Sequence, residues 1–267
     1  MPAEPVTNLP LEDRRLGRER LFAPLVVLVA LVAWETLSRA GLVSALFFPA
    51  PSVIAVAFLR LLRDGTLLSH LLATLRRLAT GFVAGALPAL VLGLAMGRSR
   101  RLRAAIDPLV ASVHPIPKIA VLPLIMIIFG IGEISRVVLI AAGAFFPILI
   151  NTMAGVRQIS PIHFEVAQNY GASPLKLFTR VLFPGSLPMI LAGVRLGLNI
   201  SLLLAITSEV VLSGPGLGRI IWNAWETLRT EEIYASLVVI ACLGVAFSLT
   251  LQYLTRRLVP WQAEHEV

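Results

Sequence analysis

Charged residues are scarce in this chain of 267 residues. Asp, Glu, Lys and Arg together make up 14% of it, whereas about 25% is usual for a soluble domain. Hydrophobic residues supply 57%. Cysteine is nearly absent, because Cys242 is alone and lies in an apolar run, which excludes a disulfide framework and a cysteine-based metal site. This composition indicates a polytopic membrane protein.

Nucleotide and metal motifs are missing as well. No Gly-x-x-x-x-Gly-Lys-Ser/Thr stretch occurs, so the chain has no phosphate-binding loop of its own. No His-Glu-x-x-His pair occurs, and the four histidines are scattered along the sequence. The glycines of 214–218 lack the dinucleotide-binding spacing and a preceding strand, and we interpret them as a turn. We therefore expect no cofactor, no metal and no catalytic residue, and a membrane-embedded enzyme ranks last among the function classes.

Long apolar runs are what the chain does have. A helix that crosses a bilayer needs about 20 mainly apolar residues, because lipid offers no hydrogen-bond partner to an exposed backbone. Between the first two runs, the apolar spacing of 53–62 is typical of an amphipathic helix that lies along the membrane surface. We predict an all-α membrane protein with about six transmembrane helices. The predicted spans are near 21–39, 71–97, 104–130, 136–156, 186–211 and 234–255.

Glycines recur four residues apart in the second run. Gly81 and Gly85 form one such pair, and Gly93 and Gly97 form another. This spacing lets a neighbouring helix approach closely. We therefore expect another span to pack against this face.

The third run is interrupted by Pro115, Pro117 and Pro123, with Lys118 among them. Each proline removes a backbone donor and clashes with the preceding turn, so a straight lipid-facing helix is not expected. Two alternatives stay open, a non-helical segment that lines a pathway and a kinked or re-entrant packing helix. Lys118 and His114 are four residues apart, and they would share a helix face and favour an anion only if the helix survived the prolines.

Three polar residues fall in the fifth run, namely Arg195, Asn199 and Glu209. Ionisable groups at membrane depth usually face a cavity or one another, so all three are candidates for lining a translocation pathway. The alternative is that Arg195 extends to the cytoplasmic edge of the membrane and Glu209 to the outer edge. Both interpretations stay open at this point.

The net charge is +8, from 23 Lys and Arg against 15 Asp and Glu. The arginine clusters flank apolar runs, as topology signals do, and we expect no nucleic-acid partner. Four arginines within the loop 98–103 indicate that this loop is cytoplasmic. Alternation of the spans then places both termini and the segment 157–183 in the cytoplasm. The apolar stretch 21–37 is longer than the region of about 7–15 residues in a signal peptide, which favours an uncleaved first span.

The segment 157–183, called the elbow from here on, carries the signals of two short helices. Ser160-Pro161 and Ser173-Pro174 each supply an N-cap residue and a proline at the first helical position. Gly171, between them, can take the left-handed conformation that ends a helix without the steric cost of a β-carbon. We predict a stiff turn between two helices.

The elbow resembles the EAA loop of ABC importer permeases. The family pattern is Glu-Ala-Ala, three residues, Gly, nine residues, then Ile-x-Leu-Pro, and the spacing is kept in full. The resemblance extends over about 70–258 and is nearest to the sulfonate, taurine and nitrate branch of these permeases. The residues in register are Glu165, Ala167, Gly171 and Pro184, and conservative replacements stand at Val166, Val181 and Phe183.

This resemblance implies the type I importer permease fold in a bacterial inner membrane. It divides the chain into a cytoplasmic N-terminal segment (1–20), a first span with its connection (21–69), the core permease (70–258) and a cytoplasmic tail (259–267). The implied partners are a second, identical permease subunit, two ATPase subunits and an external solute-binding protein. Glu165, Ala167 and Gly171 would contact the ATPase, which alone would hydrolyse ATP.

The resemblance also implies a small organic or inorganic anion as substrate, such as a sulfonate, taurine or nitrate. The alternative from another class is a secondary transporter driven by an ion gradient. Such a transporter needs paired ionisable residues near the midplane and often has two matching halves with broken helices. This chain has one proline-rich run and no convincing repeat, so the importer is preferred.

Overall fold

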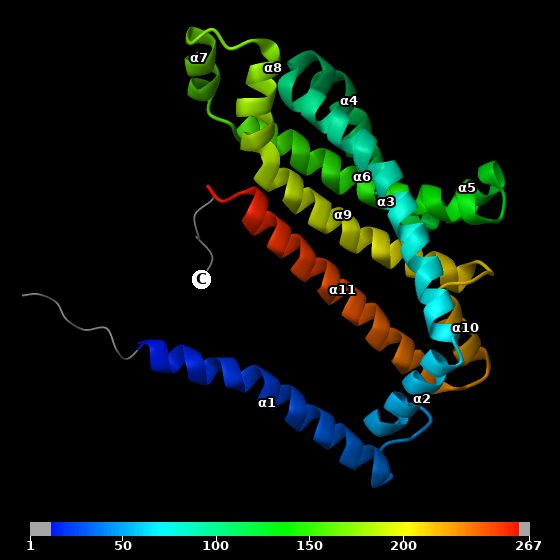
Figure 1. Ribbon diagram of the computed structural model, residues 1–267. Coiled ribbons are helices and arrows are strands. Elements are labelled where there is room, and N and C mark those ends of the chain that lie inside the picture. Colours follow the sequence, from blue (N-terminus) through cyan, green and yellow to red (C-terminus); the bar gives the residue numbers. More distant parts are fainter. Residues whose placement is uncertain (1–11, 262–267) are drawn as a thin grey trace, which may run out of the picture.

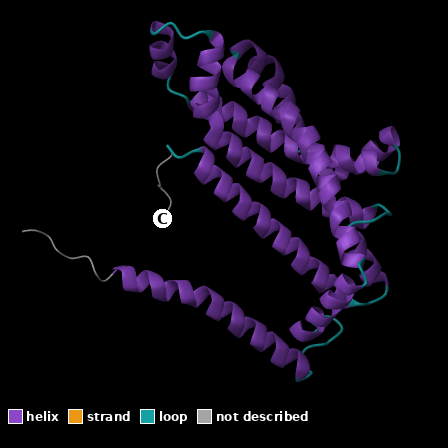
Figure 2. Cartoon of the chain, in the orientation of Figure 1, coloured by secondary structure: helices purple, strands orange, loops and turns teal. Residues whose placement is uncertain are grey.

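The computed structural model describes residues 12–261, with side chains from residue 24 onward. Part of the expected N-terminal segment (1–11) and the end of the expected tail (262–267) therefore lie outside the described residues. Within 12–261 the chain is helical and contains no strand (Figure 2). The helices are α1 (Glu12–Arg39), α2 (Pro51–Arg63), α3 (Thr66–Arg98), α4 (Arg100–Val113), α5 (Leu122–Phe129), α6 (Glu133–Gln158), α7 (Pro161–Asn169), α8 (Pro174–Leu177), α9 (Phe183–Val211), α10 (Leu217–Glu226) and α11 (Thr230–Leu258).

Four helical segments with described side chains are long and apolar enough to cross a membrane. They are α3, α6, α11 and the stretch Pro174–Val211, in which α8 continues into α9 through one π-helical turn, Phe178–Leu182. A fifth span results if α4 and the segment Lys118–Phe129 are counted together, although they are bent by 88°. α1 covers the first predicted run, and the predicted six would be reached only if α1 also crosses the membrane.

The helices α3, α6 and α9 form the centre of the bundle, with α6 packed against both of the others. Glycines permit this packing, as predicted for α3. A β-carbon at Gly81 would lie 2.7 Å from Ile140, and one at Gly85 would overlap the backbone of Ala141. On α9, a β-carbon at Gly193 would lie 2.8 Å from the β-carbon of Asn151. The three backbones therefore approach more closely than larger residues would allow.

The bundle has two distinct ends (Figure 1). At one end, α3 finishes, α4 begins, and the elbow with α7 and α8 extends beyond the bundle near the end of α11. At the other end lie α2, α10 and the first turns of α3 and α11. The elbow, the segment 98–103 and the last turn of α11 thus share one end, as the predicted alternation of spans requires. The predicted loop 98–103 is reduced to Ser99, because α3 ends at Arg98 and α4 begins at Arg100.

The helix α1 diverges from the bundle and meets it only near its last turns (Figure 1). There the ring of Trp34 contacts that of Tyr234 of α11, with 5.5 Å between the ring centroids and an angle of 59° between the ring planes. The amphipathic helix α2, expected over 53–62, buries Ile54 and Leu61 in a cluster with α10 and α11, and Arg60 forms a 2.8 Å ion pair with Glu232. The connection after the first span is therefore packed against the core.

Candidate functional site

The elbow consists of two helices joined by a tight turn, as the sequence predicts. α7 begins at Pro161 after Ser160 at the N-cap position and ends at Asn169. Gly171 has φ +72°, and no atom lies within 4 Å of the position that its β-carbon would take. The left-handed backbone, and not a lack of space, is therefore what favours glycine here.

The second half of the elbow is continuous with the bundle. α8 begins at Pro174, and the Ser173 hydroxyl accepts a hydrogen bond from the Lys176 backbone N–H at 3.4 Å. The chain then stays helical from Pro174 to Val211. A displacement of α8 is therefore expected to reach the far end of α9 through helical backbone alone.

α7 and Tyr170, the C-cap residue that follows it, expose a row of apolar side chains, called the apolar stripe from here on. No residue of α7 is buried. Ile162, Val166 and Tyr170 follow one another at intervals of four, which places them on one face of the helix. Val166 is 49% exposed and Tyr170 is 88% exposed. Large apolar side chains that are exposed in a row are typical of a contact surface.

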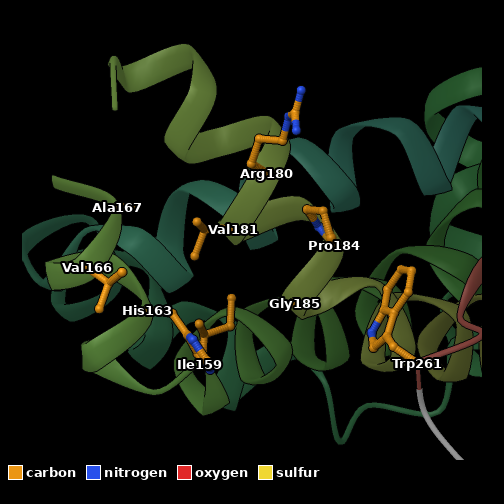
Figure 3. A pocket seen from close by; sticks show the side chains of 9 residues that line it. All are labelled: Ile159, His163, Val166, Ala167, Arg180, Val181, Pro184, Gly185 and Trp261. Atoms are coloured by element: carbon orange, nitrogen blue, oxygen red, sulfur yellow. The ribbon is translucent and has the colours of Figure 1, made fainter. Parts of the chain in front are cut away.

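A groove of about 380 Å³ separates α7 from the start of α9 (Figure 3). Val166 and Ala167 form its α7 side, and Val181 and Pro184 face them from the π-helical turn and the first turn of α9. Both halves of the pattern that resembles the EAA loop therefore lie across one groove. The remaining lining residues are Ile159, His163, Arg180, Gly185 and Trp261.

The three residues predicted to couple to an ATPase differ in their surroundings. Glu165 and Gly171 are exposed, whereas Ala167 is half-buried in the groove wall. Glu165 forms no salt bridge among the described residues. Its carboxylate is thus available to a partner, and the coupling role of the three stays a prediction.

His114 and Lys118 are neighbours, although not in the way expected. α4 ends at Val113, so the helix does not continue through the prolines and the condition for a shared helix face is not met. The Lys118 ammonium instead donates hydrogen bonds to the carbonyls of Val113, His114 and Ile116 at 2.8–3.1 Å. It also lies 4.4 Å from the ring centroid of Phe146, which the His114 ring contacts as well. Lys118 therefore stabilises the break after α4.

The three polar residues of α9 separate into two groups. Arg195 and Asn199 are exposed on one face of the helix, and Arg195 forms no salt bridge within residues 24–261. Glu209 is 0% exposed. In this conformation the Glu209 carboxylate therefore faces other groups of the chain and not solvent.

Glu209 belongs to a group of buried and half-buried charges at the end opposite the elbow, called the charged cluster from here on. Its carboxylate pairs with Arg77 and accepts hydrogen bonds from the Thr74 hydroxyl at 2.9 Å and the Gly218 backbone N–H at 3.1 Å. The members of the charged cluster are Thr74, Arg77, Glu133, Arg136 and Glu209. α3, α6 and α9 each contribute to it.

The loop 212–216 wraps around the charged cluster. Arg77 donates to the Pro215 carbonyl at 3.1 Å, and Arg136 donates to the Ser213 carbonyl. A β-carbon at Gly216 would overlap the Glu209 carboxylate, and one at Gly214 would lie 2.9 Å from the Arg136 guanidinium. The turn predicted from these glycines thus packs against the end of the bundle, because its backbone lies directly against the side chains of Glu209 and Arg136.

Comparisons with known proteins agree with this architecture. Residues 89–264 match the model of a family described as the binding-protein-dependent transport system inner membrane component. The taurine transport system permease protein TauC of Escherichia coli is 36% identical over 88% of both chains. The putative aliphatic sulfonates transport permease protein SsuC of Bacillus subtilis is 33% identical over 98% of this chain and 96% of its own length.

A solved structure supports the fold independently. A chain of the MetNI methionine ABC transporter in an inward-facing conformation superimposes with a TM-score of 0.56, at 24% identity, over 69% of this chain and 90% of its own length. With a family match over most of the sequence and relatives above 30% identity across nearly all of it, this chain belongs to the binding-protein-dependent transport system inner membrane component family and is a permease subunit.

Proposed function

We propose that this permease works in an ATP-driven importer that takes up a small organic anion of the sulfonate or taurine type. The elbow docks on a separate ATPase in the cytoplasm, and an external solute-binding protein delivers the substrate to the opposite end. The names of the relatives TauC and SsuC support the substrate class. The exposed apolar stripe of α7 is the single observation that carries the docking.

The shape of the elbow suits this role. A helix that exposes Ile162, Val166 and Tyr170 can insert into a groove of a partner as a helix-in-groove contact, with Glu165 beside the stripe as a charged contact. Because α8 continues into α9 without a break, rotation of the partner would be transmitted along α9. ATP binding would then switch the pathway between its inward-open and outward-open states.

A second copy of this chain is proposed as the membrane partner. Arg195 and Asn199 are exposed on α9 among apolar neighbours. An arginine at membrane depth is costly against lipid and normally faces a water-filled cavity or another protein. A pathway between two α9 faces, one from each copy, would give both residues such surroundings. Lys118 and His114, near the break after α4, are proposed to add positive potential at its edge.

The orientation of the chain follows from its positive charges. The arginines of 98–103, the elbow and the end of α11 lie at the same end of the bundle (Figure 1). Short loops rich in Arg and Lys remain on the cytoplasmic side during insertion. We therefore assign this end, with both termini, to the cytoplasm of the bacterial inner membrane.

The proposal is tested by Val166→Glu, which adds a charge to the apolar stripe, against Gln168→Glu as the control. The control adds the same charge on the same helix about 200° away. Purification from native membranes should recover the ATPase with the wild-type chain and with Gln168→Glu, and Val166→Glu should lose it. Purified wild-type complex in proteoliposomes should accumulate taurine only with ATP. Accumulation driven by a proton or sodium gradient in the absence of ATPase would refute the importer.

A further inference from the structure

Arg77 and Arg136 of the charged cluster hold a carboxylate that is only half enclosed. Both arginine side chains are 3% exposed, whereas the Glu133 side chain between them is 47% exposed. Arg77 binds the two Glu133 oxygens through Nε and Nη2, at 2.8 and 2.6 Å. Arg136 Nη1 binds the same carboxylate at 2.6 Å. One half-exposed carboxylate therefore lies between two buried cations and the solvent.

The charge balance indicates what happens when Glu133 moves away. Arg77 keeps its buried partner Glu209, while the Arg136 guanidinium loses its one carboxylate. Two arginines and one glutamate then leave a net charge of +1 in a site with little access to water. Such a site favours a single small anion, because the attraction is much less screened there than in bulk water.

Two further features favour an anion at this place. Glu133 is the first residue of α6, a helix of 26 residues whose N-terminus has no side-chain cap. The partial positive charge of a helix N-terminus stabilises an anion near its first turn. In addition, the buried Arg136 Nε has no hydrogen-bond partner among the described residues, so Arg136 retains unused donor capacity.

We infer that Arg77 and Arg136 form an anion-binding site in which the Glu133 carboxylate is displaced by the sulfonate or carboxylate group of an incoming small anion. The inference rests on the proposed function, in which this end of the bundle faces the external binding protein. The planar arginine fork binds two oxygens of one group side by side, as it binds the Glu133 carboxylate. Glu133 is half-exposed already, so water can solvate its carboxylate once the incoming anion has taken over the hydrogen bonds from Arg77 and Arg136.

The site would receive the anion before it reaches Arg195 in the middle of α9. Glu133 returns to the arginines once the anion has left, so the site is neutral when empty. A competing carboxylate of this kind weakens binding, which allows the substrate to continue instead of remaining at the entrance. This chain would thus contribute to the selection of negatively charged substrates, in addition to the binding protein.

The test measures methanesulfonate binding to the purified permease in nanodiscs by calorimetry, without ATPase or binding protein. Glu133→Ala removes the competing carboxylate, and we expect binding to tighten about tenfold relative to wild type, which corresponds to about 1.4 kcal/mol. The double variant Glu133→Ala with Arg136→Gln should lose this gain. Glu226→Ala removes an exposed carboxylate from α10 at the same end and should bind as wild type does.

The neutral analogue dimethyl sulfone separates charge recognition from shape, and it should bind none of the variants. Equal binding of methanesulfonate to wild type and Glu133→Ala would overturn the inference, as would a gain that persists without Arg136. If Glu133→Ala is recovered unfolded, the wild-type protein decides the question, because methanesulfonate should raise its unfolding temperature and equimolar dimethyl sulfone should not. An equal rise with both compounds would overturn the inference. None of these readouts involves the ATPase, so they are independent of the Val166→Glu test.

Discussion

The two ends of the bundle are stabilised in opposite ways. At the elbow, α7 has no buried residue and its apolar side chains are exposed. At the charged cluster, Glu209 is 0% exposed and receives hydrogen bonds from a side chain of α3 and the first turns of α10. α9 connects the two ends. One end of this helix is thus held by local turns and exposes apolar side chains, whereas the other end is held by ion pairs and hydrogen bonds to other helices of the chain.

The largest effect is expected when the buried end is broken by Glu209→Ala. This variant leaves the Arg77 guanidinium without its fully buried partner and the Thr74 hydroxyl and Gly218 N–H without their acceptor. Removing one member of a buried ion pair costs about 3–5 kcal/mol, because a charge is left desolvated and unpaired. Thermal unfolding in detergent should show a large loss of stability.

The matched variant is Glu231→Ala on α11, whose carboxylate is 3.9 Å from Arg60 in a partly exposed pair. Such a pair contributes about 0–1 kcal/mol, so this variant should unfold close to wild type. Equal unfolding temperatures for Glu209→Ala and Glu231→Ala would show that the charged cluster does not fix this end of the bundle.

The next largest effect is expected in the middle of the bundle, from Gly85→Ala. The added β-carbon would overlap the Ala141 backbone of α6, which cannot move aside as a side chain could. Overpacking of this kind costs about 1–3 kcal/mol. Gly244→Ala on α11 is the control, since no atom lies within 4 Å of its β-carbon position, and helix propensity favours that change. The difference between the unfolding temperatures of Gly85→Ala and Gly244→Ala measures the cost of crowding the α3–α6 contact. Equal unfolding temperatures would contradict the close packing of these two helices.

The elbow was the more predictable of the two ends, because its signals are local. Ser160-Pro161, Gly171 and Ser173-Pro174 determine where helices begin and end within a few residues of themselves, and the structure confirms the turn and the left-handed glycine. The glycine pairs of α3 likewise predicted a closely packed helix, although not that the partner would be α6.

The charged cluster was not predictable in the same way. Arg77 and Glu209 are 132 residues apart, and each is near the end of its own apolar run. A charge in that position normally extends to the membrane edge. Only the packing of α3 against α9 brings the two together, and no periodicity in the sequence encodes it. Similarly, three prolines predicted an interruption in the third run but not the 88° bend that follows α4.

A smaller effect on the bundle, but a decisive one on docking, is expected from Gly171→Pro. Proline holds φ near −65°, whereas Gly171 has φ +72°, and the hydrogen bond from the Gly171 N–H to the Gln168 carbonyl would also be lost. The unfolding temperature should stay within about 1 °C of wild type, because the elbow contributes little buried surface. Co-purification of the proposed ATPase should be lost.

Gly171→Asn is the control for this change, since asparagine tolerates the left-handed conformation better than other residues with a side chain. It should retain the ATPase. Normal co-purification with Gly171→Pro would contradict the proposed role of the turn, and a large drop in the unfolding temperature of that variant would contradict the separation of the two ends.

The smallest effect is expected from Ser173→Ala, which removes the N-cap of α8. The Ser173 hydroxyl accepts one hydrogen bond, from the Lys176 backbone N–H at 3.4 Å, so the cost should be near the lower end of the range for helix caps, about 0.5 kcal/mol. This cost should appear as faster amide hydrogen exchange within 175–177 and not as a change in global unfolding. Exchange that also accelerates along α9 would show that α8 and α9 open as one unit. In that case a loosened elbow would also loosen the bundle. The two ends would then not be independent, because the helix would open as one unit from the elbow inward.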